Sequence, residues 1–194
     1  MKITRYIGYF SLILTLFIFS IFFINLFEDK EVNFPERNLP LGEIKTFDGN
    51  LLDVSLLKKN EFSLLNVWAT WCINCKLEHG FLMAKKAEGW NIVGLNYKDD
   101  LEKAFKWLDQ YGNPYFVNLY DQDGTYGFNL GVSGAPETYL LKKDKILQKH
   151  IGIMSEKVWK DKFIPLIKKY NVVLDISFFT IFFLGSKEYL RVFK

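Results

Sequence analysis

Apolar residues are concentrated near the two ends of the chain, and the stretch between them alternates short apolar and polar segments. The first apolar run covers residues 7–27, which are 21 uncharged positions with 16 hydrophobic side chains. At about 1.5 Å per helical residue, this run spans a hydrocarbon core of about 30 Å. A cleaved secretory signal, the alternative, has a shorter apolar stretch that ends in small residues. The pattern therefore predicts a transmembrane anchor at residues 7–27.

The charges around this run leave its orientation nearly undetermined. Two basic residues precede the run and three follow it closely, so the positive-inside count is almost tied. Long domains cross membranes largely regardless of charge. We therefore expect residues 1–6 to form a short cytoplasmic tail, with the rest of the chain exported.

The middle of the chain predicts a polar tether at residues 28–38 and a folded domain at residues 39–170. Strand-like and helix-like patterns alternate in the domain. The expected strands are 63–69, 91–97, 116–120, 138–142 and 145–151, and the expected helices are 72–88, 99–110 and 156–170. Asp99, with Glu102 three residues later, resembles a capping box for the second helix, and Ser155 is a candidate cap for the third.

This order of elements predicts an α/β fold. Strands separated by helices pair in parallel through right-handed crossovers, and the final hairpin adds antiparallel strands. The expected architecture is a mixed sheet flanked by helices on both faces, preceded by the transmembrane helix.

Composition narrows the class of protein. The 194 residues leave room for one ordinary domain and an appendage, and they include only two cysteines. Two cysteines exclude a scaffold with several disulfides, and a formal net charge of +3 is too weak to indicate nucleic-acid binding.

The two cysteines, Cys72 and Cys75, follow the first strong strand and open a helix. A thiol in the first helical turn lies near the partial positive charge of the helix and its free N–H groups, which stabilise a thiolate. Cys72 is therefore the expected nucleophile. Cys75, one turn further along, is the expected resolving thiol, which attacks the mixed disulfide formed by Cys72.

Two other interpretations of the pair remain open. A structural disulfide is one, although a bridge across two residues constrains the unfolded chain little. A zinc site is the other, because His79 and His150 bring the ligand set to four. Structural zinc sites usually contain a second closely spaced ligand pair, which this chain lacks, so both histidines are expected at the surface or partly buried.

Four motifs carry a resemblance to a known family: Trp68-Ala-Thr-Trp-Cys72-Ile-Asn-Cys75-Lys-Leu-Glu78-His79, Asn96-Tyr-Lys-Asp-Asp100, Gly112-Asn-Pro-Tyr115 and Gly131-Val-Ser-Gly-Ala-Pro-Glu-Thr138. Together they resemble the CcmG/DsbE family of membrane-anchored, thioredoxin-like thiol:disulfide interchange proteins of bacterial cytochrome c maturation. The similarity runs from the anchor to about residue 170. The family usually has proline first between the cysteines, whereas this chain has Ile73-Asn74.

The resemblance implies roles for five further residues. Pro136 is expected in the cis form facing the cysteines, which leaves the Ala135 backbone free to pair with an extended substrate. Trp71 is expected to pack over the site. Glu78 and Glu137 are expected near it, where an acid raises the cost of the thiolate and can relay a proton to or from Cys75. Ordinary solvated carboxylates and an ordinary loop proline are the alternatives.

The implied function is that of a thiol:disulfide oxidoreductase. It would reduce the disulfide of apocytochrome c, or of its thiol carrier, before haem attachment, and a membrane thiol-transfer protein would supply the electrons. No metal, flavin or nucleotide cofactor is expected besides the Cys72–Cys75 disulfide, and the expected location is the bacterial inner membrane with the domain on the periplasmic side. A general disulfide oxidase or isomerase, and an apocytochrome-binding holdase with incidental cysteines, remain alternatives.

The second apolar segment, residues 172–184, lies in a hydrophobic tail at residues 171–194. At 13 residues interrupted by Asp175, it is too short to span a bilayer. An extra packed element, a patch on the membrane surface and a sequence altered near the stop codon all remain possible interpretations.

Overall fold

The computed structural model describes residues 2–27, 34–55 and 62–171. The chain divides into two compact units, Met1–Asn33 and Phe34–Lys194. The first contains one helix, α1 (Lys2–Phe27), which includes the apolar run at residues 7–27. A helix that combines the length and the apolarity needed to cross a membrane is not found among the described residues.

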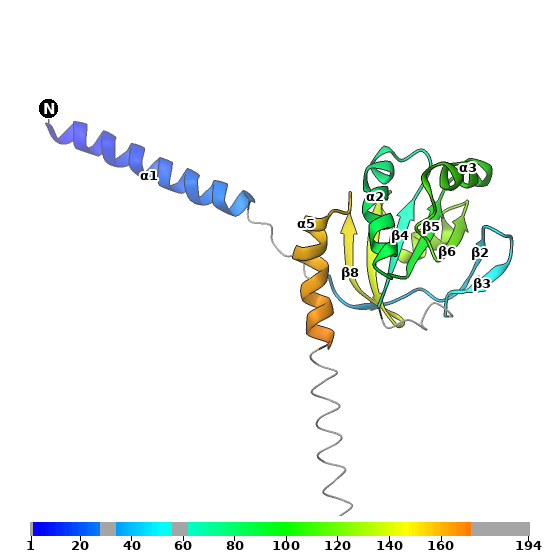
Figure 1. The fold of residues 1–194 in the computed structure, drawn as a ribbon. Coiled ribbons are helices and arrows are strands. Elements are labelled where there is room, and N and C mark those ends of the chain that lie inside the picture. The colour runs from blue at the N-terminus through cyan, green and yellow to red at the C-terminus, as the bar shows by residue number, and fades with distance from the viewer. Residues whose placement is uncertain (1, 28–33, 56–61, 172–194) are drawn as a thin grey trace, which may run out of the picture. The chain divides into compact units, whose positions relative to one another are not determined.

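The second unit is built on one mixed sheet of eight strands (Figure 1). The strands are β1 (Arg37–Asn38), β2 (Glu43–Thr46), β3 (Leu51–Asp53), β4 (Ser63–Trp68), β5 (Ile92–Tyr97), β6 (Val117–Asp121), β7 (Glu137–Lys142) and β8 (Lys145–Ile151). Their order is β1-β8-β7-β4-β5-β6-β2-β3. β4, β5 and β6 are parallel, while β7 and β8 form an antiparallel hairpin beside β4.

Helices cover both faces of the sheet. They are α2 (Ile73–Ala87), α3 (Leu101–Tyr111), α4 (Thr125–Leu130) and α5 (Glu156–Val158), which continues as the π-helix η2 (Trp159–Phe163) and stays helical through residues 164–171. One core cluster joins α2, α3 and η2 to the face of β4 that carries Leu64 and Trp68. The other joins α4 to Leu65 and Val67 on the opposite face. Figure 1 shows α2 and α5 in front of the sheet.

The expected elements of the domain are present with small changes at their ends, and Ser155 caps α5 as predicted. Three short strands, β1 to β3, and the helix α4 were not predicted. β1 also corrects the tether, because Arg37 and Asn38 pair with Ile146 and Lys145 of β8. The tether predicted at residues 28–38 is therefore too long at its C-terminal end. The predicted tail lies outside the described residues from position 172 onward.

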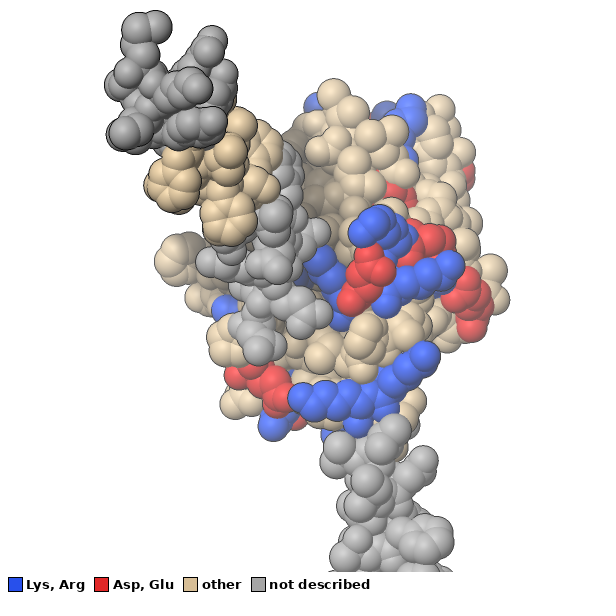
Figure 2. All heavy atoms as spheres, turned by 90° about the vertical axis from the view of Figure 1, so that its left-hand side faces the viewer, with Lys and Arg blue, Asp and Glu red and all other residues tan. Residues whose placement is uncertain are grey.

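Opposite charges are interleaved on the side of the domain that carries α5 and β8 (Figure 2). Lys85 of α2 is buried and binds Glu156 of α5 at 2.8 Å, and Lys157 binds Asp161 at 2.7 Å. Lysines and acids thus lie close together on this side, and two of the lysines form ion pairs there.

Candidate active site

The cysteines lie where β4 leads into α2, and they form a disulfide with an S–S distance of 2.13 Å. Cys72 is the N-cap of α2, and its Sγ accepts a hydrogen bond from the Cys75 amide at 3.0 Å. Cys72 is 7% exposed and Cys75 is 2% exposed. The predicted placement is thus observed: Cys72, the less buried of the two cysteines, lies at the N-terminal end of the helix, where a thiolate is stabilised.

The loop that precedes Cys72 is held by Asp99. This buried carboxylate accepts hydrogen bonds from the backbone amide and the hydroxyl of Thr70, both at 2.6 Å. It also accepts one from the side-chain amide of Asn96 at 2.8 Å. The predicted capping role of Asp99 is wrong, because the N-cap of α3 is Asp100. The side chain of Asp99 is turned instead toward the cysteine loop.

Trp71 is part of this loop and is about half exposed. Its indole N–H donates to the Lys98 carbonyl at 3.0 Å. Lys98 adopts a positive φ of 49°, an uncommon conformation for a residue other than glycine. The structure therefore leaves a surface of Trp71 available next to Cys72, while Trp68 is buried in the core.

Glu78 is a buried acid on the same face of α2 as Cys75. The two residues are three positions apart, which makes them neighbours on a helix, and Glu78 is 1% exposed. Its carboxylate accepts hydrogen bonds at 2.8 Å from the Asn66 side chain and from the Met154 amide. Burial raises the pKa of Glu78 to about 7, although both hydrogen bonds act in the opposite direction. The alternative of a solvated helix carboxylate is therefore wrong.

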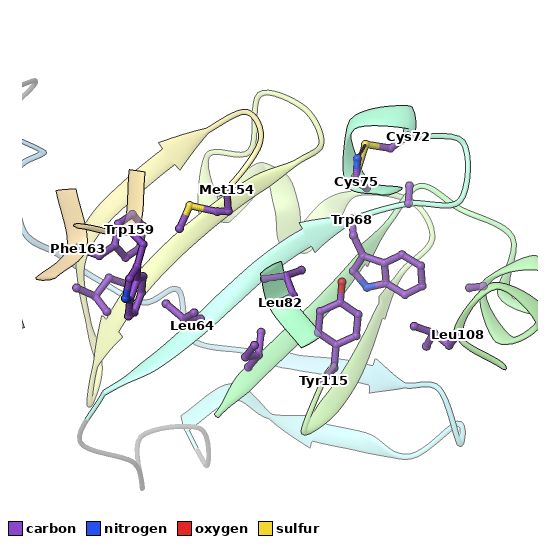
Figure 3. Packing of buried hydrophobic residues seen from close by; sticks show 14 of the residues in the cluster. Leu64, Trp68, Cys72, Cys75, Leu82, Leu108, Tyr115, Met154, Trp159 and Phe163 are labelled. Atoms are coloured by element: carbon purple, nitrogen blue, oxygen red, sulfur yellow. Dashed lines mark hydrogen bonds between the residues drawn. A yellow bond between two sulfur atoms is a disulfide. The ribbon is translucent and has the colours of Figure 1, made fainter. Parts of the chain in front are cut away.

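Asn66, which the sequence analysis did not single out, organises this acid. Its amide nitrogen donates to Glu78 and, at 3.1 Å, to Thr138, while its oxygen accepts from the Tyr115 hydroxyl at 2.9 Å. The Tyr115 ring stacks on Trp68, at 5.4 Å between centroids (Figure 3). An asparagine between apolar residues in the middle of a strand was the available signal, because buried polar groups require partners.

The loop before β7 lies at the same end of the sheet as the cysteines. β4 and β7 are antiparallel with Val67 opposite Glu137, so the end of β4 and the start of β7 coincide. The Ala135–Pro136 peptide bond is cis, as the resemblance implied. Ala135 packs against the core cluster that contains both cysteines.

Glu137 is fully buried, and its partners differ from those of Glu78. One carboxylate oxygen accepts from the Ser133 amide at 2.8 Å and from the Ser133 hydroxyl, and the other accepts from the Tyr139 hydroxyl at 2.7 Å. Lys149 forms an ion pair with it at 3.0 Å. Burial by itself raises the pKa of Glu137, but the hydrogen bonds from Ser133, Tyr139 and Lys149 outweigh burial and lower it.

The two histidines are engaged with carbonyl groups. Nε2 of His79 lies 3.1 Å from the carbonyl oxygens of Tyr111 and Gly112, and Nε2 of His150 lies 3.2 Å from that of Ile153. His79 is more buried than expected, and burial lowers its pKa. Over residues 2–27, 34–55 and 62–171, the structure shows no group of three or more His, Cys, Asp or Glu that could hold a metal ion.

The fold and this site define a thioredoxin-like oxidoreductase class, and comparisons with known proteins agree. The Redoxin family model matches residues 34–162. The thiol:disulfide interchange protein DsbE of Escherichia coli K12 is 44% identical over 138 residues, which cover 70% of this chain and 75% of that protein. DsbE of Yersinia pestis is 48% identical over 124 residues, covering 63% of this chain and 66% of that protein. The chain therefore belongs to the CcmG/DsbE family of thiol:disulfide interchange proteins.

Solved structures show the same fold. A secreted disulfide oxidoreductase of Mycobacterium tuberculosis is 23% identical with a TM-score of 0.51, covering 60% of this chain and 90% of its own. A thio-disulfide isomerase of Thermus thermophilus is 18% identical with a TM-score of 0.55, covering 68% and 95%. At these identities the likeness supports the fold alone.

Proposed function

We propose that this protein reduces the disulfide of apocytochrome c, or of the thiol carrier that serves it, before haem attachment. The observation that carries the proposal is the placement of Cys72 at the N-terminus of α2, beside the cis Ala135–Pro136 loop, in a member of the CcmG/DsbE family. A low thiol pKa is favoured at this position, and the half-exposed Trp71 next to it offers an apolar contact to a substrate.

The reaction consists of two exchanges. The Cys72 thiolate attacks one sulfur of the substrate disulfide, forms a mixed disulfide and releases one substrate thiolate. Cys75 then loses its proton and attacks the Cys72 sulfur, which releases the second substrate thiolate and leaves the Cys72–Cys75 disulfide. Two electrons pass to the substrate, and the dithiol of a donor protein returns two electrons by the reverse exchange.

Glu78 is the proton acceptor for Cys75 in this scheme. Its buried position one turn beyond Cys75 and a pKa of about 7 suit a group that exchanges a proton near neutral pH. Asn66 and the Met154 amide hold the carboxylate in place. The proposed chemistry needs no metal, flavin or nucleotide, since both electrons reside in the cysteine pair.

The proposed location is the bacterial inner membrane, with the domain in the periplasm. The support is the uncharged run at residues 7–27, which lies within α1. An anchor would confine the protein to the plane of a membrane thiol-transfer protein, which is the proposed electron donor.

The direct test is cysteine trapping with the full-length Cys75→Ala variant. Without the resolving thiol, the mixed disulfide between Cys72 and its substrate should accumulate and should dissociate on reduction. The double variant Cys72→Ala/Cys75→Ala is the matched control. Capture of apocytochrome c or an exported thiol carrier supports the proposal, whereas recovery of cytoplasmic proteins alone refutes both the substrate and the location.

Two measurements separate the alternatives. A reduction potential near the value of about −120 mV of a strong oxidant such as DsbA would identify an oxidase and contradict the reductase. Continued support of cytochrome c maturation by a Cys72→Ser variant would identify a holdase, because a binding protein has no need of the thiol.

A further inference from the structure

The loop between α4 and β7 is tied to the sheet by cations from two other strands. Arg37 of β1 donates to the Leu130 carbonyl, and Lys149 of β8 donates to the Gly131 carbonyl at 2.7 Å. These carbonyls end α4, where the helix exposes unpaired acceptors and partial negative charge. The first half of the loop is thus fixed from the side of β1 and β8.

Glu137 fixes the second half of the same loop. Its carboxylate receives the Ser133 amide at 2.8 Å and the Gly134 amide at 3.2 Å, and it pairs with Lys149 at 3.0 Å. Lys149 therefore joins the Gly131 carbonyl to Glu137, and Glu137 joins the residues just before Ala135 to β8. Both members of the ion pair are nearly enclosed, with side-chain exposures of 12% for Lys149 and 0% for Glu137.

Glu137 also points away from the cysteines. Successive side chains of a strand face opposite sides of a sheet. Thr138, the next residue, accepts a hydrogen bond from Asn66 and so faces the side of the sheet that carries Glu78. Glu137 instead accepts a hydrogen bond from the Tyr139 hydroxyl. Tyr139 belongs to the core cluster on the opposite face. The carboxylate of Glu137 is saturated by the loop and by Lys149 and does not share the network of Glu78.

We propose that Glu137 and Lys149 are a positioning pair, which holds the 131–136 loop in the conformation that presents the Ala135 backbone to a polypeptide substrate. The pair acts on substrate docking and not on the proton or electron chemistry of the cysteines. This inference rests on the proposed function, and it revises the role that the family resemblance implied for Glu137. A small disulfide without a peptide backbone does not need the loop and is therefore indifferent to the pair.

The test compares two kinds of disulfide with the reduced, full-length protein in detergent. One is a short peptide whose Cys-Xaa-Xaa-Cys-His segment is oxidised, and the other is hydroxyethyl disulfide. Glu137→Gln and Lys149→Met should each lower the rate with the peptide about tenfold, a scale typical of lost alignment, and leave the rate with hydroxyethyl disulfide within about twofold. Lys149→Arg should restore most of the peptide rate. Lys145→Met is the matched control, because Lys145 lies on the same strand with its side chain 54% exposed.

The outcomes separate this inference from the proposed function. A second peptide has an unrelated sequence but the same disulfide ring, and it shows whether the unaltered protein prefers the apocytochrome segment. Equal rates with both peptides would contradict the proposed substrate and leave the positioning role unaffected. The positioning role is read from the ratio of either peptide to hydroxyethyl disulfide. The positioning role would be overturned if the variants reduced the peptide and hydroxyethyl disulfide with equally lowered rates, or if neither rate changed. Collapse of the fold in all three variants would also overturn it.

Discussion

Glu78 is expected to make the stability of the oxidised protein depend on pH, and Glu78→Gln is expected to remove that dependence. The pKa of Glu78 rises from 4.5 to about 7 because the carboxyl group is buried, so the native state holds a proton that the unfolded state releases between these values. Native stability from this residue is therefore fully present below about pH 4.5 and is lost as the pH rises through about 7. At about 1.4 kcal/mol per pH unit, the loss is about 3 kcal/mol. This loss is a large share of the free energy of unfolding of a typical native protein, which is about 5–15 kcal/mol.

The assay is urea denaturation of the full-length chain in detergent at several pH values between 5 and 8. The disulfide form is used because its cysteines do not titrate. Subtracting the curve of Glu78→Gln from that of the unaltered protein isolates this one residue from the other titrating groups. Glu102→Gln is the control, since Glu102 is an exposed partner of Lys106 on the helix surface. Parallel curves for the unaltered protein and Glu78→Gln over this range would refute the assignment of a raised pKa to Glu78.

Two further predictions concern the supports of the site. Asp99→Ala removes the acceptor of three hydrogen bonds from Thr70 and Asn96. It should therefore destabilise the domain by about 2–4 kcal/mol and accelerate alkylation of reduced Cys72. An unchanged melting temperature and an unchanged alkylation rate would contradict the role of Asp99 in holding the cysteine loop. Gly94→Ala would place a Cβ 2.6 Å from the Tyr115 ring and should cost about 1–3 kcal/mol in thermal unfolding. Gly80→Ala in α2 meets open space and serves as its control.

Much of the fold could be predicted because its signals are local. The strand predicted at residues 63–69 matches β4 (Ser63–Trp68), and the strand predicted at residues 145–151 matches β8 (Lys145–Ile151). The position of Cys72 at the start of a helix also follows from local pattern, as does the cap at Ser155. These features depend on residues only a few positions apart in the chain, so their pattern can be recognised in a single sequence.

The missed elements lack such signals. β1 has two residues and β3 has three, which is too short for an alternating pattern to be recognised. Glycine disfavours helix, and α4 is flanked by Gly124 and Gly131 and contains Gly127. These segments adopt their structures because the edges of the sheet and the second core cluster provide partners from distant parts of the chain.

The sequence by itself determined which chemistry is present: two thiols at a helix start, a proline before a strand, and two acids near them. Only the tertiary structure decided where the acids lie and which groups surround them. Glu78 is enclosed by Asn66 and Met154, which lie 12 and 76 positions away, while Glu137 is turned to the other face and neutralised by Lys149. The pKa and the role of a carboxyl group depend on burial and on the partners that surround it, and these are set by packing between distant segments.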